Sequence, residues 1–393
     1  MNTRQRFRQD VRKGKGETSP RLSVILCTYN RRNLVLSTLA SLRRQTLPYN
    51  EFEVLVIDNG STDGTLNAVR AYVSAGMQQY KNPEDMWRVQ CLYEPQHGLA
   101  YARNTGLLAA SGEIVVFLDD DAMADPYFLE HVLAAYDETH ADALGGRVEL
   151  YWEVPRPHWL ADDLLELLGY YAPATTQTQL KPFASFSSTN FSVRVEVLRT
   201  IGCFSPFLSK KQHQPVSMEV FDLCCRLHAA GYTLWYEPAA VVTHRVPAAR
   251  LIRPFFVGRA YWQARSEVLA QYVGTKHTGG KPSYSTAFLL GAALQELGEI
   301  LYLFLIHRPL LRLAGKPSSE RLAAAMNQAR SWGRLQQYLQ LLEHAPIDLT
   351  TAAVLLVRTV EPDLTADLLA QALNSQDVYC SVSIADIPLS WLW

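Results

Sequence analysis

Three consecutive carboxylates, Asp119, Asp120 and Asp121, directly follow the apolar run IVVFL at residues 114–118. Adjacent carboxylates repel one another, and a bound cation normally relieves such repulsion. Mg²⁺ and Mn²⁺ prefer oxygen ligands and often bind one or two carboxylates together with substrate phosphates. A solvated turn or the start of a helix would also suit acidic residues. Because the preceding run is so apolar, we favour a metal site.

A second polar segment, VIDNGSTDGT, contains Asp58, Asn59, Ser61 and Asp63 and completes the apolar run that begins at Phe52. An acid in this position can accept hydrogen bonds from a ribose or a base. Ser, Thr and Asp are equally ordinary in a turn that caps the next helix. This segment by itself therefore leaves both interpretations open.

The first apolar run, LSVILC, ends in a third polar group: Thr28, Tyr29, Asn30 and Arg31. A dinucleotide-binding turn would need the pattern G-x-G-x-x-G here, and its absence argues against a nicotinamide-dependent dehydrogenase. Tyr29 can instead stack on a base, and Arg31 can meet a phosphate. These residue types favour a nucleotide ligand.

Arg103 and Asn104 lie in the segment GLAYARNTGL, which is otherwise largely apolar and has helical spacing. An arginine on such a face suggests a bound anion or a buried aspartate partner. An exposed arginine on a solvated helix is the weaker alternative, because so few polar residues surround it.

Apolar runs begin near residues 22, 52, 89 and 113, and amphipathic stretches separate them at the spacing of βαβ units. Short, continuous, β-branched runs are typical of buried parallel strands. We therefore predict an α/β fold with a mostly parallel, Rossmann-like sheet flanked by helices. Ligands of such sheets bind at the carboxyl ends of strands, where the polar groups occur.

The composition limits the class of protein and its partners. The chain has 393 residues, is 48% hydrophobic and carries a formal net charge of −1. These values exclude a disordered chain, a collagen and a uniformly basic nucleic-acid binder, so we expect no nucleic-acid partner. Residues 22–244 carry a net charge of −9, whereas residues 245–334 carry +9. The acidic part suits metal binding, and the basic part suits an anionic surface.

Four of these segments together resemble glycosyltransferase family 2, the inverting enzymes with a GT-A fold. TYNR, DNGSTDGT, ARNTGL and FLDDDA occur in the family's order and approximate spacing, over about residues 21–250. The resemblance implies a nucleotide-sugar donor, a divalent metal (Mn²⁺ or Mg²⁺) and transfer to the hydroxyl of a sugar or lipid-linked acceptor. Polysaccharide or glycolipid synthesis is the implied process.

The same resemblance implies the site residues. The nucleotide-sugar site would comprise Thr28, Tyr29, Asn30, Arg31, Asp58, Asn59, Ser61, Asp63, Arg103, Asn104 and Asp120. Asp119 and Asp121 would form the metal-binding DxD signature, and His244 stands where many relatives supply a further ligand. A hydrogen-bonded histidine in the protein core is the alternative for His244.

The catalytic base is the least typical part of the pattern. SMEVFDLCCR looks like the family's E-D-x-D-L-x-x-R stretch, with Glu219, Asp222 and Arg226 in place. Val220 stands where the family has the aspartate that usually serves as general base. A carboxylate must take the proton of the attacking hydroxyl, so Glu219 is our first candidate and Asp222 the second.

The chain divides into four predicted regions. Residues 1–20 form a disordered basic arm, 21–250 the GT-A domain, 251–345 a helical region and 346–393 a small segment of unknown role.

Within the helical region, Ala287–Ile306 has the length of a membrane span, but its two glutamates offset its apolar residues and disfavour insertion. It is either the core helix of a bundle or an interfacial helix. We predict a cytoplasmic protein, peripheral on the inner face of the membrane.

Two other functions are compatible with parts of the sequence. A sugar-phosphate nucleotidyltransferase would share the sheet and an acidic metal site, but CTYNRR lacks the Gly-rich basic loop expected after its first strand. A catalytically degenerate binding subunit finds support in Val220, against which stand the three intact aspartates.

Overall fold

The computed structural model describes residues 19–77, 87–181, 184–206, 208–209, 218–277 and 286–342. The chain forms two compact units. The first comprises the described residues of 1–151, 169–209 and 219–245, and the second those of 152–168, 210–218 and 246–393. The predicted basic arm, apart from its last two residues, and the predicted segment 346–393 lie outside the described residues.

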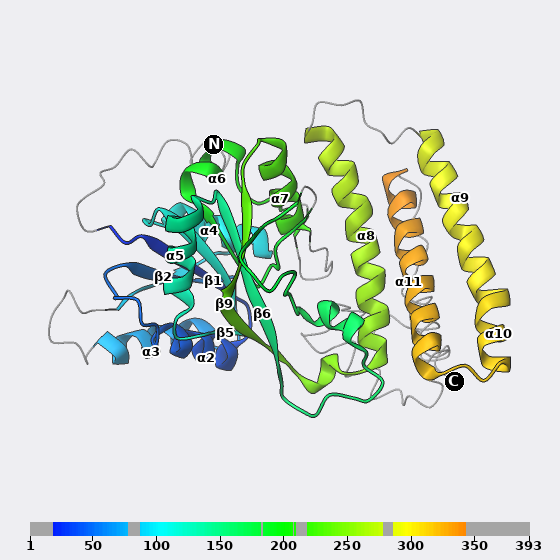
Figure 1. Cartoon of the computed structure of the whole chain (residues 1–393), viewed down its shortest axis with the longest axis horizontal. Coiled ribbons are helices and arrows are strands. Elements are labelled where there is room, and N and C mark those ends of the chain that lie inside the picture. Colours follow the sequence, from blue (N-terminus) through cyan, green and yellow to red (C-terminus); the bar gives the residue numbers. More distant parts are fainter. Residues whose placement is uncertain are drawn as a thin grey trace. The chain divides into compact units, whose positions relative to one another are not determined.

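A nine-stranded sheet is the centre of the first unit (Figure 1), in the order β3-β2-β1-β4-β8-β6-β9-β5, with β7 paired to β9. The strands are β1 (Leu22–Thr28), β2 (Phe52–Asp58), β3 (Arg88–Tyr93), β4 (Ile114–Asp119), β5 (Ala122–Ala124), β6 (Ala143–Trp152), β7 (Thr178–Gln179), β8 (Asn190–Arg194) and β9 (Leu234–Val246). The first four are the predicted strands, and they pair in parallel. Strand β8 joins β4 antiparallel, and β5 and β7 join β9 antiparallel. The expected helix-flanked α/β sheet is thus confirmed, with an antiparallel part beyond β4.

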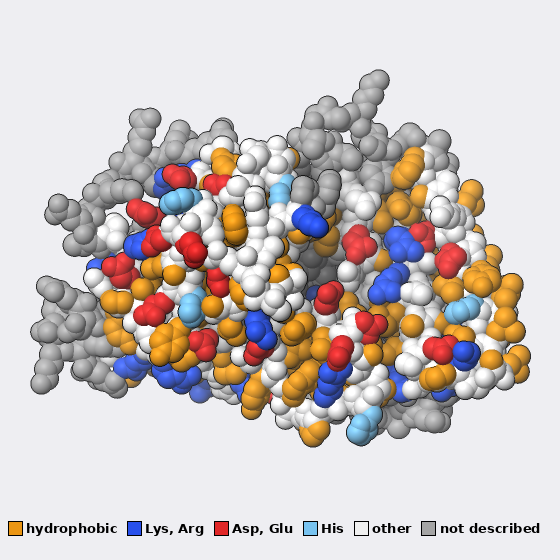
Figure 2. All heavy atoms as spheres, viewed as in Figure 1, with side chains coloured by type: hydrophobic (Ala, Val, Ile, Leu, Met, Phe, Trp, Pro, Cys, Tyr) orange, Lys and Arg blue, Asp and Glu red, His pale blue; other side chains and the backbone are white. Residues whose placement is uncertain are grey.

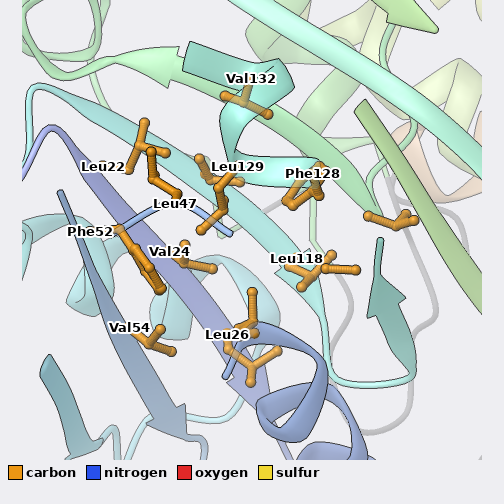
Figure 3. Close-up of a cluster of buried hydrophobic side chains, with 14 of the residues drawn as sticks. Leu22, Val24, Leu26, Leu47, Phe52, Val54, Leu118, Phe128, Leu129 and Val132 are labelled. Atoms are coloured by element: carbon orange, nitrogen blue, oxygen red, sulfur yellow. The ribbon is translucent and has the colours of Figure 1, made fainter. Parts of the chain in front are cut away.

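Helices cover both faces of this sheet. They are α2 (Arg32–Leu42), α3 (Thr65–Met77), α4 (Leu99–Ala109), α5 (Phe128–Thr139), α6 (Val195–Ile201) and α7 (Glu219–Ala229). Because side chains alternate along a strand, Leu22, Val24 and Leu26 of β1 point into one buried cluster with α2 and α5 (Figure 3). Ile25 joins the opposite cluster, with residues of α4 and α7. Burial on both faces explains why these runs are continuously apolar.

The second unit is helical. It contains η3 (Asp162–Leu168), η4 (Ala248–Arg250), α8 (Arg253–His277), α9 (Thr286–Tyr302), a π-helical segment η5 (Leu303–His307), α10 (Arg308–Leu313) and α11 (Ser318–Leu341). Helix α11 packs against both α8 and α9. None of the helices in the described ranges is long and apolar enough to cross a membrane.

Candidate active site

The ends of three neighbouring strands bring the predicted motifs together. In the parallel register, Thr28 at the end of β1 lies beside Asp58 at the end of β2. On its other side, Cys27 lies beside Asp119 at the end of β4. Segments separated by about 90 residues in the chain therefore meet at one edge of the sheet, because parallel strands present their carboxyl ends together.

Two of the three consecutive aspartates are held by one arginine. Nη1 of Arg31 donates to Asp120 Oδ1 over 3.0 Å and to Asp121 Oδ2 over 2.9 Å. Thr28 Oγ1 also donates to Asp120 Oδ2, over 2.7 Å. Burial raises the pKa of Asp120 to about 6, although Arg31 opposes that shift. Asp120 and Arg31 are both predicted to bind the nucleotide-sugar donor. Within the protein they also form an ion pair in which their opposite charges balance.

Asp119 is the most accessible of the three carboxylates. Its side chain is 23% exposed, against 7% for Asp120 and 6% for Asp121. Oδ2 accepts a hydrogen bond of 2.9 Å from Thr189 Oγ1 at the start of the β8 segment. Oδ1 lies 3.7 Å from Nη2 of Arg103. This carboxylate is therefore oriented by the protein and still open to a ligand.

His244 lies against Asp121, as the metal interpretation requires. Strand β5 pairs with β9 so that Ala122 is opposite His244, which brings the imidazole Nε2 to 3.4 Å from Asp121 Oδ1. Gly169, at φ +100°, permits this packing, because a Cβ there would come within 3.0 Å of His244 Nδ1. Asp121 and His244, two of the three predicted metal ligands, therefore lie side by side.

The guanidinium group of Arg103 is buried among aromatic side chains. It lies 5.9, 5.4 and 5.5 Å from the ring centres of Phe117, Phe191 and Phe204. Nη1 donates to Glu219 Oε1 over 2.9 Å, and Nη2 donates to the carbonyl of Ser188. The buried acidic partner expected for this arginine is therefore a glutamate from α7.

Glu219 and Asp222, the two candidate bases, have different surroundings. Glu219 is fully buried, and its Oε2 has no hydrogen-bond partner among the described residues. Asp222 accepts a hydrogen bond from Nε of Arg226, whose Nη atoms hold the carbonyls of residues 201–203. Asp222 is thereby tied into a structural network. Val220 is buried in an apolar cluster.

An aromatic pair lies in the predicted nucleotide site. Tyr29 and His97 contact edge to face, with ring centres 5.4 Å apart. His97 also lies over Gly60, where a Cβ would come within 2.9 Å of its ring. Asp58 is buried, and within the described ranges its Oδ1 has no hydrogen-bond partner. A buried hydrogen-bond acceptor without a donor costs free energy. This oxygen is therefore suited to accept a hydrogen bond from a ligand.

Other predicted donor-binding residues mainly hold the loops in place. Asn30, at φ +52°, accepts from the backbone N–H of Thr62, and its own N–H donates to Ser61 Oγ. Asp63 accepts from Thr65 at the start of α3. The side chain of Asn59 donates hydrogen bonds to the carbonyls of Glu94 and Gln96 and accepts one from the N–H of Gly98. Asn104 exchanges two hydrogen bonds with the backbone of Phe204. The capping interpretation therefore accounts for Asp63.

Three residues in the site were not predicted from the sequence: His97, Ser188 and Thr189. Ser188 and Thr189 belong to FSSTNF, a polar break between two apolar stretches. That composition is a signal for a loop, but it carries no information on which carboxylate or arginine the loop contacts. His97 precedes the helix that carries Arg103 and resembles any exposed histidine.

Comparison with known proteins agrees with these motifs. Residues 23–202 match the model of the family described as Glycosyl transferase family 2. Glycosyltransferase AglE of Haloferax volcanii is 37% identical over 252 residues, which cover 63% of this chain and 74% of that protein. The chain belongs to glycosyltransferase family 2. The family resemblance and the expectation of a glycosyltransferase are thereby confirmed.

Other similarities of this family 2 chain cover less or are more distant. Validoxylamine A glucosyltransferase of Streptomyces hygroscopicus subsp. jinggangensis is 41% identical over 125 residues, 31% of this chain and only 27% of that protein. Among solved structures, a mannosyltransferase from Pyrobaculum calidifontis in complex with GDP-Man and Mn²⁺ aligns with a TM-score of 0.46 at 20% identity. That alignment covers 95% of this chain and 88% of the mannosyltransferase chain.

Proposed function

We propose that this chain transfers a sugar from a nucleotide-sugar donor to an acceptor hydroxyl, with inversion at the anomeric carbon and with a divalent metal. One observation carries the proposal: Tyr29, Asp58 and Asp119 stand at adjacent strand ends, and Asp58 keeps a buried oxygen unpaired within the described residues. An unpaired carboxylate oxygen beside an aromatic pair suits the base and ribose of a nucleotide.

The metal would be held by Asp119, Asp121 and His244. In the described ranges no three acidic, histidine or cysteine side chains lie close enough to form a complete metal site. The fit rests on Asp121 Oδ1 and His244 Nε2, whose 3.4 Å separation suits two ligands at about 2.1 Å from one ion. Carboxylate and imidazole are donors that Mn²⁺ accepts. When bound, the ion would stabilise the negative charge of the departing diphosphate.

Arg103 and Arg31 would keep the carboxylates in position. Arg31 pairs with both Asp120 and Asp121, which offsets part of the repulsion among the three neighbouring acids before the ligand binds. Arg103 lies 3.7 Å from Asp119 and is itself fixed by Glu219. The two arginines would therefore hold the carboxylate side chains of the site in fixed orientations. Asp119 would stay accessible to a ligand.

In the reaction, the acceptor oxygen would attack the anomeric carbon as the bond to the diphosphate breaks. The hydroxyl proton must pass to a base, and we assign that role to Glu219. Its Oε1 is bound to Arg103, while Oε2 is without a hydrogen-bond partner in the part of the chain that the structure describes. Asp222 is the weaker candidate because the arginine that holds it, Arg226, also binds the carbonyls of residues 201–203, which makes the contact part of a structural network.

We place the reaction in polysaccharide or glycolipid synthesis, at the cytoplasmic face of a membrane. A sugar or lipid-linked acceptor is expected, and the basic composition of residues 245–334 suits an anionic membrane surface.

A screen of nucleotide-sugar donors with Mn²⁺ or Mg²⁺ tests the proposal. Release of a nucleoside diphosphate, dependent on the metal and lost in Asp119→Ala, is the expected result. Release of pyrophosphate from a nucleoside triphosphate and a sugar phosphate would instead identify a nucleotidyltransferase. Donor binding without any product release would identify a binding subunit.

A further inference from the structure

Helix α9 has one apolar face that is packed and a second that is exposed. Ala293 and Ile300 are buried and cluster with Leu335 of α11. Leu294 and Leu301 lie next to them in the sequence but are exposed, with 67% of Leu294 accessible. Consecutive residues of a helix lie about 100° apart around its axis, so the two rows lie on different faces of α9. The bundle interpretation of this segment is therefore correct for one face only.

The exposed row continues beyond α9 through η5 and α10. We call this surface the α9–α10 face, and its members are Leu294, Leu297, Leu301, Phe304, Leu305, Ile306, Leu310 and Leu313. Leu313 has 84% of its surface accessible. Figure 2 shows hydrophobic side chains gathered over these helices. A contiguous apolar surface of this kind on a monomer marks an interaction site.

Charged and polar residues border this face. Arg312 lies in α10, Lys316 in the turn that follows and Arg321 in the first turns of α11, and all three are exposed. Glu320, also exposed, pairs with Lys316 over 3.5 Å. Gln295 and Glu299 are exposed on the other side of the Leu294 row and form a polar edge of α9. An apolar face with a basic border is typical of a helix that lies in the interface of a membrane.

We propose that the α9–α10 face inserts into the headgroup region of an anionic bilayer. Charge decides between a bilayer and a second copy of the chain. Arg312, Lys316 and Arg321 border this face, and an anionic surface complements their charge, whereas a second copy would bring two such basic borders together. This proposal depends on the proposed function in one respect: membrane binding would bring the enzyme to a lipid-linked acceptor.

Apolar insertion differs from purely electrostatic attachment in its response to salt. Attraction between Lys or Arg and anionic lipid weakens as salt screens it, while burial of leucine side chains does not. Binding should therefore fall in high salt but persist at a measurable level. This separates insertion from the loose, salt-released attachment that composition alone would suggest.

The test is co-sedimentation of the full chain with vesicles of phosphatidylglycerol and phosphatidylcholine. The variant Leu301→Gln/Leu305→Gln/Leu313→Gln should lose at least about tenfold in vesicle affinity, because three exposed side chains no longer transfer from water. The matched control is Leu108→Gln, an exposed leucine of α4 in the other unit, and it should bind as the wild type. Arg312→Gln/Lys316→Gln should weaken binding mainly at low salt.

Wild-type binding by the triple variant, or no binding by the unmodified chain, would overturn the proposal. A dimer in solution that the triple variant dissociates would show that a second copy occupies the face instead. Release of nucleoside diphosphate from the donor without vesicles provides the separate readout for the proposed function. That activity should be unchanged in the triple variant, whose substitutions lie outside the candidate active site.

Discussion

Arg103 of α4 and Glu219 of α7 form an ion pair of 2.9 Å in which both side chains are at most 3% exposed. Removing one partner of such a pair leaves a buried charge without compensation, which typically costs about 3–5 kcal/mol. The same arginine lies 3.7 Å from Asp119, so the pair connects the candidate base with the candidate metal ligand. Its position makes both residues informative targets.

Glu219→Gln should lower kcat by about 10²–10⁴-fold, the usual contribution of a general base, with little change in donor KM. Glutamine keeps an oxygen that can accept from Arg103 but removes the charge that pairs with it, so the free energy of unfolding must be measured beside turnover. The measurement is kcat and donor KM of the variant beside the wild type at a single pH.

Asp222→Asn is the comparison for Glu219→Gln and should reduce turnover less, through the Arg226 network. If Asp222→Asn is inactive while Glu219→Gln is fully active, the two roles must be exchanged.

Asp119→Ala should abolish transfer and leave the fold intact. The side chain is partly exposed and has neighbouring carboxylates, so its removal relieves repulsion and should hold or raise the stability of the metal-free protein. Thermal denaturation with and without Mn²⁺ provides a second readout: a ligand at 100 times its Kd stabilises by about 2.7 kcal/mol. Near wild-type turnover of the variant in the presence of EDTA would contradict the metal assignment.

Arg31→Gln should destabilise the protein, because Asp120 and Asp121 would both lose their cationic partner in a buried site. We expect a loss of about 3–5 kcal/mol in the free energy of unfolding, measured by urea denaturation. Divalent metal should recover part of the loss if the same carboxylates bind it. Arg32→Gln is the matched control, since its side chain lies on the exposed surface. Equal stability of the two variants would contradict the pairing as a stabilising contact.

Tyr29→Ala should weaken donor binding through the loss of stacking, by about 1–3 kcal/mol or roughly 5–150-fold in Kd. The measurement is competition by the nucleoside diphosphate product, with kcat little changed at saturating donor. Tyr127→Ala, which removes an exposed tyrosine elsewhere on the same unit, serves as the control. A change of similar size in the control would argue against a specific role for Tyr29.

Val220→Asp should lower the free energy of unfolding by about 3 kcal/mol, because it would bury an unpaired carboxylate in an apolar cluster. Restoring the family's residue type is therefore not expected to raise turnover. Urea denaturation and donor turnover measure the two effects. Higher turnover in this variant would mean that the position can supply the base after all.

The sequence by itself determined the first four strands, their helices and the polar groups that follow them. Strands β1 and β4 are apolar on both faces, and that pattern is local to each segment. The turn and motif residues around Asp58 and Asp119 are local signals of the same kind. Family membership followed from these segments in order, without knowledge of how they pack.

Only the tertiary structure decided which side chains meet. Asp120 and Asp121 pair with Arg31 about 90 positions away, and Arg103 pairs with Glu219 across 116 positions. It also decided that one apolar face of α9 packs on α11 while the next is exposed, which the largely apolar composition of the helix could not reveal. The physical reason is that the local periodicity of apolar residues determines whether a segment forms a helix or a strand. Contacts between segments far apart in the sequence depend instead on how the whole chain packs around its hydrophobic core.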